Sequence, residues 1–375
     1  MSICIIAHNA YGAMTGGRSG HVGGAEYQTA LMARWFASRG YETSILTWDE
    51  GQPSKMILSG VKILKMCRHN DGFPVLRFFH PRLSSLYASM RVAAADVYYH
   101  NSAEYVTGLV AAWCKHNNKK FVYSVASDVA CYSHLPAMTR GYERILYRHA
   151  LHNADRIIVQ TEHQRNLLKS EYGLNALPLP MPYPEPEQEE NNEDFWLKPH
   201  HVLWAGRLVS IKRLEWLLDI ADCLPEITFD VAVANIGSSS YSKTLYSRAQ
   251  SMKNVIWHGR VDRQDMPALY KRAGCLCCTS LYEGFPNTFL EAWSHSRPVV
   301  STVDPDGLIE RLNLGIIRKD IPGLVNAIQI LISEKEMWQE KSRNSRRYYF
   351  DNHRIEIAMP RFEHEFLTLW SNSKE

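Results

Sequence analysis

The chain has 375 residues, of which 45% are hydrophobic and 22% are charged. These proportions are typical of a soluble globular protein and exclude a mostly disordered, collagen-like or coiled-coil chain, and the length fits two domains of about 150–200 residues. The net charge is +3, with the basic excess in residues 1–180; it favours an anionic substrate or membrane surface, or is only solvated surface charge, and is too weak for a nucleic-acid binder.

The first half of the chain alternates short apolar runs with longer helical patterns, as parallel strands with crossover helices do. A helix is expected from Gly24 to Ser38, with Gly40 as its stop signal. Before it, the glycine-rich stretch 12–20 either lets the backbone approach a phosphate or sugar closely or forms a flexible acceptor-side loop. The candidate strands are Ile3–Ala7, Glu42–Thr47, Val61–Leu64, Val97–His100, Lys120–Val125 and Arg156–Gln160.

The clearest domain boundary lies at residues 178–200. Four alternating prolines, from Pro178 to Pro184, are followed by Pro186 and an acidic stretch, a composition that prevents a helix and cannot form a core. We therefore expect one domain at 1–180, a linker at 181–200 and a second domain at 201–354. The last helical stretch, at about Ile355–Ser371 within 355–375, follows the complete second sheet. It is expected to pack back on either domain, with the first domain favoured.

The second half reads as a six-stranded doubly wound sheet. Its candidate strands are His201–Ala205, Ile227–Ala234, Asn254–His258, Cys275–Ser280, Pro298–Thr302 and Gly315–Arg318. Its candidate helices include Arg213–Cys223, Ser242–Met252, Met266–Ala273 and Thr288–His295. Ligands of such sheets bind at the carboxyl ends of strands, where helix N-termini point backbone N–H groups at anions. The loops after these strands are therefore the places to search for a site.

The loop after the first of these strands carries two cations. Gly206 permits a tight turn, and Arg207 and Lys212 flank the next helix start. A planar guanidinium and a compact ammonium at one strand end suit a diphosphate, although such residues are more often plain surface residues.

A second loop carries two carboxylates around a helix start. Pro286 begins a helix whose free N–H groups at residues 287–289 would cradle a phosphate. Glu283 before this helix and Glu291 within it would accept hydrogen bonds from sugar or ribose hydroxyls, or Glu291 only stabilises the helix near its N-terminus.

Together these loops resemble the GT4 family of retaining, nucleotide-sugar-dependent glycosyltransferases. The resemblance implies the GT-B fold, an α/β fold in which two doubly wound Rossmann-like domains face each other across a cleft. It rests on motifs that occur in the family's order along most of the chain: Gly23-Gly24 with Glu26, then Gly206-Arg207-Leu208 with Lys212, then Glu283 and Glu291 around Gly284-Phe285.

The resemblance also implies roles for single residues. Arg207 and Lys212 would hold the donor diphosphate and stabilise its charge as it leaves, and Glu283 would act at the transferred sugar. Glu291 would bind the ribose, and the loop 257–260 would lie along the base. The implied donor-binding group is Gly24, Gly206, Arg260, Gly284, Phe285, Asn287, Thr288 and Glu291. No cofactor or metal is implied, because the two cations replace a divalent ion; the nucleoside-diphosphate sugar is a co-substrate.

The chain departs from the family at the reacting centre. Many relatives place a His after the strand that ends here at Val122–Asp128, which contains none. Asp128 is the nearest polar candidate for orienting the acceptor hydroxyl or accepting its proton, and His100 is the second. In a front-side reaction the leaving phosphate itself takes the proton, so no side-chain base is required.

The acceptor side is the least readable part. We assign Glu26 and His100 to it and expect a glycan or a lipid-linked glycan, with no nucleic-acid partner. Segments 68–91 and 142–149 mix Arg with aromatic residues, so they would lie on an anionic membrane, or they are ordinary helix faces with extended Arg side chains.

Other features point to the cytoplasm rather than to metal or redox chemistry. Cys275 and Cys278 have a ligand-like spacing, but no second pair follows and the run resembles a buried strand. Asp304 and Asp306 read as a turn. No signal peptide or bilayer-spanning stretch is evident, so we expect a cytoplasmic protein that can work at the inner face of the membrane.

The sequence therefore predicts a hexosyltransferase of polysaccharide or lipopolysaccharide synthesis. Three rivals stay open. A sugar-nucleotide epimerase would need acid/base carboxylates and no acceptor site, a phosphorylase would carry a pyridoxal-phosphate lysine that we do not find, and a non-catalytic sugar-nucleotide-binding subunit would show binding without turnover.

Overall fold

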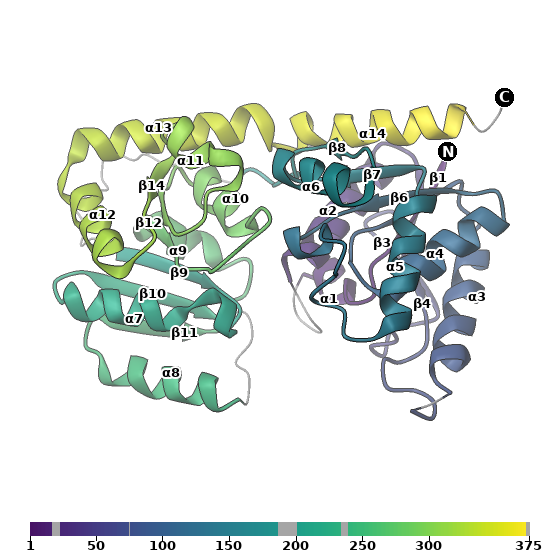
Figure 1. Cartoon of the computed structure of the whole chain (residues 1–375), viewed down its shortest axis with the longest axis horizontal. Helices are drawn as coiled ribbons and strands as arrows, with labels where there is room; N and C mark the ends of the chain where they lie inside the picture. The colour runs from purple at the N-terminus through teal and green to yellow at the C-terminus, as the bar shows by residue number, and fades with distance from the viewer. Residues whose placement is uncertain (17–22, 75, 187–200, 234–238, 373–375) are drawn as a thin grey trace. The chain divides into compact units, whose positions relative to one another are not determined.

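A computed structural model describes residues 1–16, 23–74, 76–186, 201–233 and 239–372 of the chain (Figure 1). It divides into two compact units. Unit 1 comprises Met1–Pro182 with Glu356–Glu375, and unit 2 comprises Tyr183–Ile355. Most of the predicted linker, residues 187–200, and the predicted strand end Ala234 lie outside the described residues, as do residues 17–20 of the glycine-rich stretch 12–20.

Unit 1 is built on an eight-stranded sheet in the order β3-β4-β2-β1-β5-β6-β7-β8. All neighbouring strands are parallel except the edge strand β3, which pairs antiparallel with β4. The strands are β1 Ser2–Ile6, β2 Glu42–Thr47, β3 Lys55–Leu58, β4 Val61–Lys65, β5 Val97–His100, β6 Lys120–Ser124, β7 Arg156–Val159 and β8 Leu177–Pro178. The sequence pattern missed β3 and β8, because each is a short strand at an edge of the sheet.

The helices of unit 1 lie on both faces of its sheet (Figure 1). They are α1 Tyr11–Met14, α2 Gly24–Ser38, α3 Ser84–Ala93, α4 Tyr105–His116, α5 Gly141–Asn153 and α6 Glu162–Tyr172, with the short helical segments η1 Phe78–Leu83 and η2 Asp128–Ala130. The short helix α1 stands where a continuous glycine-rich loop was expected. At α4, a Cβ on Gly108 would lie 2.2 Å from the carbonyl oxygen of Leu146, so glycine permits α5 to pack closely there.

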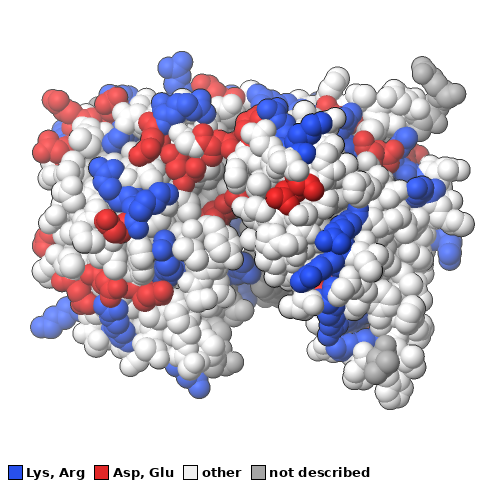
Figure 2. All heavy atoms as spheres, in the orientation of Figure 1, with Lys and Arg blue, Asp and Glu red and all other residues white. Residues whose placement is uncertain are grey.

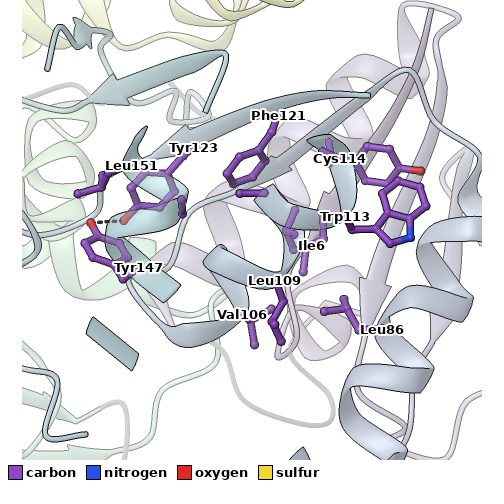
Figure 3. Packing of buried hydrophobic residues seen from close by; sticks show 14 of the residues in the cluster. Ile6, Leu86, Val106, Leu109, Trp113, Cys114, Phe121, Tyr123, Tyr147 and Leu151 are labelled. Atoms are coloured by element: carbon purple, nitrogen blue, oxygen red, sulfur yellow. Dashed lines mark hydrogen bonds between the residues drawn. The ribbon is translucent and has the colours of Figure 1, made fainter. Parts of the chain in front are cut away.

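The core of unit 1 is continuous from the sheet to α4 and α5 (Figure 3). The rings of Phe121 and Trp113 are buried in it. Tyr123 and Tyr147 satisfy each other's hydroxyls at 2.9 Å, which keeps two buried polar atoms paired inside an apolar cluster.

Unit 2 is a six-stranded, fully parallel sheet in the order β11-β10-β9-β12-β13-β14. Numbered along the chain this is 3-2-1-4-5-6, an order typical of the doubly wound sheets to which the sequence assigns this half. The strands are β9 His201–Gly206, β10 Thr228–Val233, β11 Val255–Gly259, β12 Ala273–Cys278, β13 Val299–Ser301 and β14 Gly315–Ile317. Strand β12 begins two residues earlier than predicted, since Ala273 already pairs with His201 at the end of the preceding helix.

The helices of unit 2 likewise cover both faces of its sheet (Figure 1). They are α7 Leu214–Cys223, α8 Ser240–Ser251, α9 Met266–Arg272, α10 Asn287–Ser294, α11 Leu308–Arg311, α12 Ile321–Ser333 and α13 Lys335–Asn352, with η4 Ser210–Lys212 and η5 Pro305–Gly307. Trp338 of α13 is fully buried, and its indole N–H donates to the carbonyl of Gly274 at 2.7 Å.

The last helix, α14 (Ile355–Ser371), belongs almost wholly to unit 1. Its Glu363 accepts a hydrogen bond from Tyr41 at 2.7 Å, its Glu365 pairs with Arg156 at 2.8 Å, and its Phe366 ring lies 5.1 Å from that of Phe36. The end of the chain thus returns to the unit in which it began.

Candidate active site

The sheet of unit 2 reverses its strand order between β9 and β12, which are hydrogen-bonded neighbours. In open α/β sheets the crevice outside the carboxyl ends at such a reversal is the usual ligand site. The loop after β9 carries Arg207 and Lys212, and the loop after β12 carries Glu283. The predicted cations and carboxylate therefore lie at neighbouring strand ends.

Backbone-directed hydrogen bonds lock these two loops together. Arg213 donates from Nε to the carbonyl of Thr279 at 2.6 Å and from a terminal nitrogen to Ser280 at 3.0 Å. In return the Thr279 hydroxyl donates to the carbonyl of Lys212 at 2.8 Å, and the Leu281 N–H donates to the carbonyl of Ile211 at 2.8 Å. Such a rigid frame fixes the position of the charged side chains that it carries.

Within this frame Lys212 donates a hydrogen bond to Glu283 as an ion pair. The Ser280 hydroxyl donates to the same carboxylate oxygen at 2.6 Å. Lys212, Ser280, Glu283 and Thr288 line a small cavity of about 10 Å³, room for about one water molecule. The two charges satisfy each other, so a diphosphate that enters here would have to replace Glu283 as the partner of Lys212.

The remaining predicted cations of unit 2 are open to solvent. Arg207 is exposed, and its guanidinium has no hydrogen-bond partner among the residues that the structure describes. Arg260 is also exposed and directly follows β11. Gly206 ends β9, and a Cβ there would lie 3.3 Å from the Trp204 ring, so the close packing of the loop on this ring favours glycine.

The helix α10 starts at Asn287, within the range that the sequence predicts. Pro286 precedes it, and the Phe289 N–H donates to the Pro286 carbonyl at 3.0 Å. Gly284 belongs to the loop that leads from β12 to this helix. The Phe285 ring is buried against Trp293 and His353, at centroid distances of 6.1 and 5.3 Å. Phe285 is therefore available to a ligand through its backbone rather than through its ring.

Glu291 is buried on α10 with both carboxylate oxygens engaged. Tyr270 donates its hydroxyl to Oε2 at 2.7 Å, and Arg263 donates to Oε1 at 3.3 Å. The same Arg263 nitrogen reaches the Tyr183 hydroxyl at 2.9 Å. Burial and the adjacent carboxylate raise the pKa of Tyr270, so its hydroxyl stays protonated as a donor. The sequence analysis missed Tyr270 and Arg263, because a Tyr on a helical face reads as core.

The loop 257–260, predicted to lie along the nucleotide base, contributes His258 to an ion cluster around the buried Asp230. His258 donates from Nε2 to Asp230 at 2.7 Å, His201 lies 2.8 Å from the same carboxylate, and Arg272 donates to it through Nε at 2.9 Å. Burial alone would raise the pKa of Asp230, but the hydrogen bonds from these three basic side chains outweigh it and lower the pKa. Asp230 has no exposed surface, so this cluster fixes β9, β10 and β11 together.

Unit 1 has its own strand-order reversal, between β1 and β5, and a pocket of about 370 Å³ opens there. The loops after these strands contribute to its wall, as the strand-end rule requires. The polar and aromatic side chains lining the pocket include His8, Glu26, Trp48, His69, Arg82, Glu104 and Tyr105.

A carboxylate between two imidazoles forms part of this wall. Glu104 lies 3.5 Å from His8 Nδ1 and 3.4 Å from His100 Nε2, while His100 Nδ1 bonds to the Ile6 carbonyl at 2.8 Å. The His8 ring stacks on Trp48 with centroids 4.4 Å apart. Burial alone would raise the pKa of Glu104, but hydrogen bonds from His100 and His8 leave it well below its usual range. Glu104 is therefore an anion held in a fixed orientation.

The predicted acceptor residues separate in the structure. Glu26 lines the pocket from the first turn of α2, two residues after Gly24. His100 is buried behind Glu104 and reaches the pocket only through it. Asp128 lies elsewhere on unit 1, where its carboxylate accepts a hydrogen bond from Gln164 at 2.9 Å, and it does not line the pocket. His8 and Glu104 lie in the loops that follow β1 and β5, so a search of the strand ends in the first half of the sequence would have found them.

The two sequence patterns that resemble metal sites, at Asp304/Asp306 and at Cys275/Cys278, have structural roles. Asp304 accepts the backbone N–H groups of Ile309 and Glu310 at 2.7 and 3.2 Å, and η5 forms the predicted turn. Cys275 is buried in β12, where burial raises the pKa of its thiol to about 12. Across the described parts of the chain, no group of three or more His, Cys, Asp or Glu is placed to hold a metal ion. Within the same residues, no helix has the length and apolarity to cross a bilayer.

Two family models match the sequence. Residues 22–179 match the model described as Glycosyltransferase Family 4, and residues 199–334 match the one described as Glycosyl transferases group 1. Among curated proteins, the mannosylfructose-phosphate synthase of Agrobacterium fabrum is 26% identical over 196 residues, 46% of this chain and 42% of that protein. An uncharacterised glycosyltransferase of Haemophilus influenzae is 23% identical over 203 residues, 52% of this chain. The match spans 57% of that protein, so about half the length of each relative is covered.

Solved structures share the fold over nearly the whole chain. The sucrose-phosphate synthase of Thermosynechococcus elongatus superposes with a TM-score of 0.80 at 15% identity, covering 99% of this chain and all of that one. The HepE protein of Anabaena, solved with UDP-glucose, gives a TM-score of 0.77 at 15% identity, with 98% and 100% covered. WaaG, a glycosyltransferase of lipopolysaccharide biosynthesis, gives 0.68 at 15% identity, with 92% and 95% covered. Both units therefore have the architecture of GT-B glycosyltransferases.

Proposed function

The chain belongs to the group 1 glycosyltransferases of family 4, and from this premise we propose that it moves a hexose from a nucleoside-diphosphate sugar to a hydroxyl of a glycan, with retention of configuration. The observation that carries the proposal is the convergence of Lys212 and Glu283 at the β9/β12 reversal, beside the exposed Arg207.

In the proposed reaction the diphosphate binds where negative charge develops as the sugar departs. Arg207 and Lys212 meet its oxygens, together with the backbone N–H groups of Asn287 and Thr288, which stand at the start of α10. Preorganised donors of this kind lower the activation barrier of the transfer, because they are already oriented when negative charge develops on the leaving phosphate. The two cations supply the charge that a divalent metal would otherwise bring, so the reaction is proposed to be metal-independent.

When Lys212 pairs with the diphosphate, Glu283 loses this partner and becomes free for the transferred sugar. Its carboxylate, still held by Ser280 at 2.6 Å, would then accept hydrogen bonds from sugar hydroxyls. Glu291 would accept hydrogen bonds from the ribose hydroxyls in place of the one from Arg263. At 3.3 Å, that bond is the longer of the two that the Glu291 carboxylate accepts.

The acceptor is proposed to bind in the unit 1 pocket. The carboxylates of Glu26 and Glu104 suit sugar hydroxyls, and the ring of Tyr105 offers an apolar face for a pyranose. The departing phosphate takes the acceptor proton in a front-side displacement. Asp128 is the side-chain alternative; unchanged turnover in Asp128→Ala would leave the proton with the phosphate. Polysaccharide or lipopolysaccharide is the proposed product class, since WaaG has the same fold.

A turnover assay tests the proposal. UDP-, GDP- and ADP-sugars are incubated with the full chain and glycan acceptors, and nucleotide release and product anomeric configuration are followed by NMR. We test UDP-glucose first, because HepE was solved with it. Transfer with retained configuration is expected. Nucleotide binding without any turnover would instead favour a non-catalytic binding subunit, and inversion would refute the mechanism.

A further inference from the structure

The segment between β4 and α3 closes one side of the unit 1 pocket. His69 and Arg82, near its two ends, both line the pocket, and Arg82 donates to the His69 carbonyl at 2.7 Å. This bond ties residues 13 positions apart into a loop. Most of the described residues between them are exposed to solvent.

Large apolar side chains stand at the tip of this loop. Phe73, Leu76 and Phe79 are 78%, 61% and 64% exposed. They are held in successive turns, because the Leu76 N–H bonds to the Phe73 carbonyl and the Phe79 N–H to the Leu76 carbonyl, each at 3.0 Å. Single exposed apolar residues are ordinary, but a cluster of three large ones within one short segment marks an interaction site.

An aromatic bridge joins the loop to the helix α5. The Phe78 ring lies 5.4 Å from that of Tyr105, which lines the pocket, and 5.6 Å from that of Tyr142 in the first turn of α5. Tyr142 and Ile145 are themselves exposed, Ile145 by 67%. The apolar tip therefore continues onto α5; we call Phe73, Leu76, Phe79, Tyr142 and Ile145 the apolar tip surface.

Basic side chains border the apolar tip surface. Arg140, Arg144 and Arg148 recur every four residues and so follow one side of α5. Arg77 belongs to the loop itself. Figure 2 shows basic side chains gathered in a band along the face of unit 1 where α5 lies. Within the segments 69–82 and 140–148 the acidic residues are Asp71 and Glu143, so the Arg residues outnumber them.

We infer that the apolar tip surface and its basic border dock unit 1 on an anionic lipid bilayer. Exposed Phe and Leu side chains insert at the headgroup boundary, and Arg side chains around them pair with anionic headgroups. A second copy of this chain would need a matching acidic surface, and a free glycan would not need three protruding apolar groups. Given the proposed function, this docking brings the bilayer beside the acceptor pocket through Arg82 and Tyr105.

Vesicle co-sedimentation tests the docking. The full chain is mixed with vesicles of phosphatidylcholine alone and with vesicles that also contain phosphatidylglycerol. We expect sedimentation with the anionic vesicles, weakened by added salt, and at least tenfold weaker binding in the double variant Leu76→Ser/Phe79→Ser. The matched control is Ile57→Ser, because Ile57 is 70% exposed on the edge strand β3 of the same unit; it should bind as the unmodified chain does.

Absence of binding to the anionic vesicles overturns the inference, and so does an equal loss in Ile57→Ser. Arg140→Ser/Arg148→Ser provides an independent arm: it should lose binding at low salt, and unchanged binding would contradict the basic border. None of these measurements requires a donor sugar or turnover. A chain that binds vesicles but never transfers a sugar would therefore refute the proposed function and leave the docking standing.

Discussion

The two units place their charged groups in opposite ways. In unit 2 Lys212 and Glu283 pair with each other and leave a cavity of only about 10 Å³, whereas unit 1 keeps a pocket of about 370 Å³ beside Glu104. The proposed donor site must exchange internal partners when its ligand enters, while the proposed acceptor pocket is already open. The difference suits a donor common to a large family and an acceptor particular to this chain.

The units also differ in the role of a carboxylate that lies among basic side chains. Asp230 of unit 2 has no exposed surface and bonds to three basic side chains. Glu104 of unit 1 lies between two histidines at a pocket wall. The first arrangement can only contribute to stability. The second holds an anion where a ligand can reach it.

The largest expected effect is that of Asp230→Asn on stability. Removing the charge leaves three basic groups without a counter-ion, so the free energy of unfolding should fall by about 3–5 kcal/mol. Urea unfolding measures it. The control Asp222→Asn breaks an exposed pair with Arg248 and should cost less than about 1 kcal/mol. Equal effects in the two variants would contradict the structural role of Asp230.

The same variant predicts a change in pH dependence. The folded pKa of Asp230 is lowered, so its contribution is complete above its unfolded pKa of about 3.9 and is lost as the pH falls through the lower, folded value. The unmodified chain should lose this stability in that acid window, and Asp230→Asn should not. Parallel acid-unfolding curves for the two proteins would refute the assignment.

Next in size is the loss of turnover in Arg207→Ala. An exposed cation at the leaving phosphate acts mainly in the transition state, so kcat should fall by about 10²–10³ with the fold unchanged. Steady-state kinetics and circular dichroism measure the two properties. Arg343→Ala, which removes an exposed cation from α13, is the matched control and should keep full activity. Normal turnover in Arg207→Ala would refute the diphosphate assignment.

A smaller effect should distinguish the units directly. Glu104→Gln keeps the size of the side chain but removes the charge that faces the pocket, so KM for the acceptor should rise about tenfold, as for a lost hydrogen bond to a charged group. The affinity for the nucleotide should not change. Glu162→Gln on α6 is the control. A change in nucleotide affinity instead would place Glu104 at the donor.

The smallest effect is expected at the ribose. Tyr270→Phe removes one hydrogen bond that orients Glu291, so the nucleotide Kd should rise about fivefold, or about 1 kcal/mol. Calorimetric titration measures it, with the exposed Tyr282→Phe as control. An unchanged Kd in Tyr270→Phe would mean that Glu291 needs no such orientation.

Much of the fold could be predicted because strong periodicity and end signals coincide. The helix at 24–38, the strand at 42–47 and the final helix from residue 355 to 371 have the bounds that the sequence predicts. The strands β3 and β8 escaped because a short strand at a sheet edge needs neither a long apolar run nor strict alternation. Topology in unit 2 followed from the regular alternation of strand and helix.

The two sites differ in how far the sequence reveals them. Lys212 and Glu283 could be assigned to one site because each follows a strand, and the structure shows that the two strands are neighbours at the order reversal. Trp48, His69 and Arg82 come from three separate segments, and only the folded chain brings them to one pocket. Long-range convergence of this kind leaves no spacing in the sequence, which is why the acceptor side remained unread.

The most direct test of the donor site is calorimetric titration of UDP, GDP and ADP, with and without EDTA, against the unmodified chain, Lys212→Met and the exposed control Lys243→Met. We predict micromolar binding of one nucleotide, unaffected by EDTA, unchanged in Lys243→Met and at least tenfold weaker in Lys212→Met. Equal affinity in the unmodified chain and Lys212→Met would contradict a diphosphate site at the β9/β12 reversal.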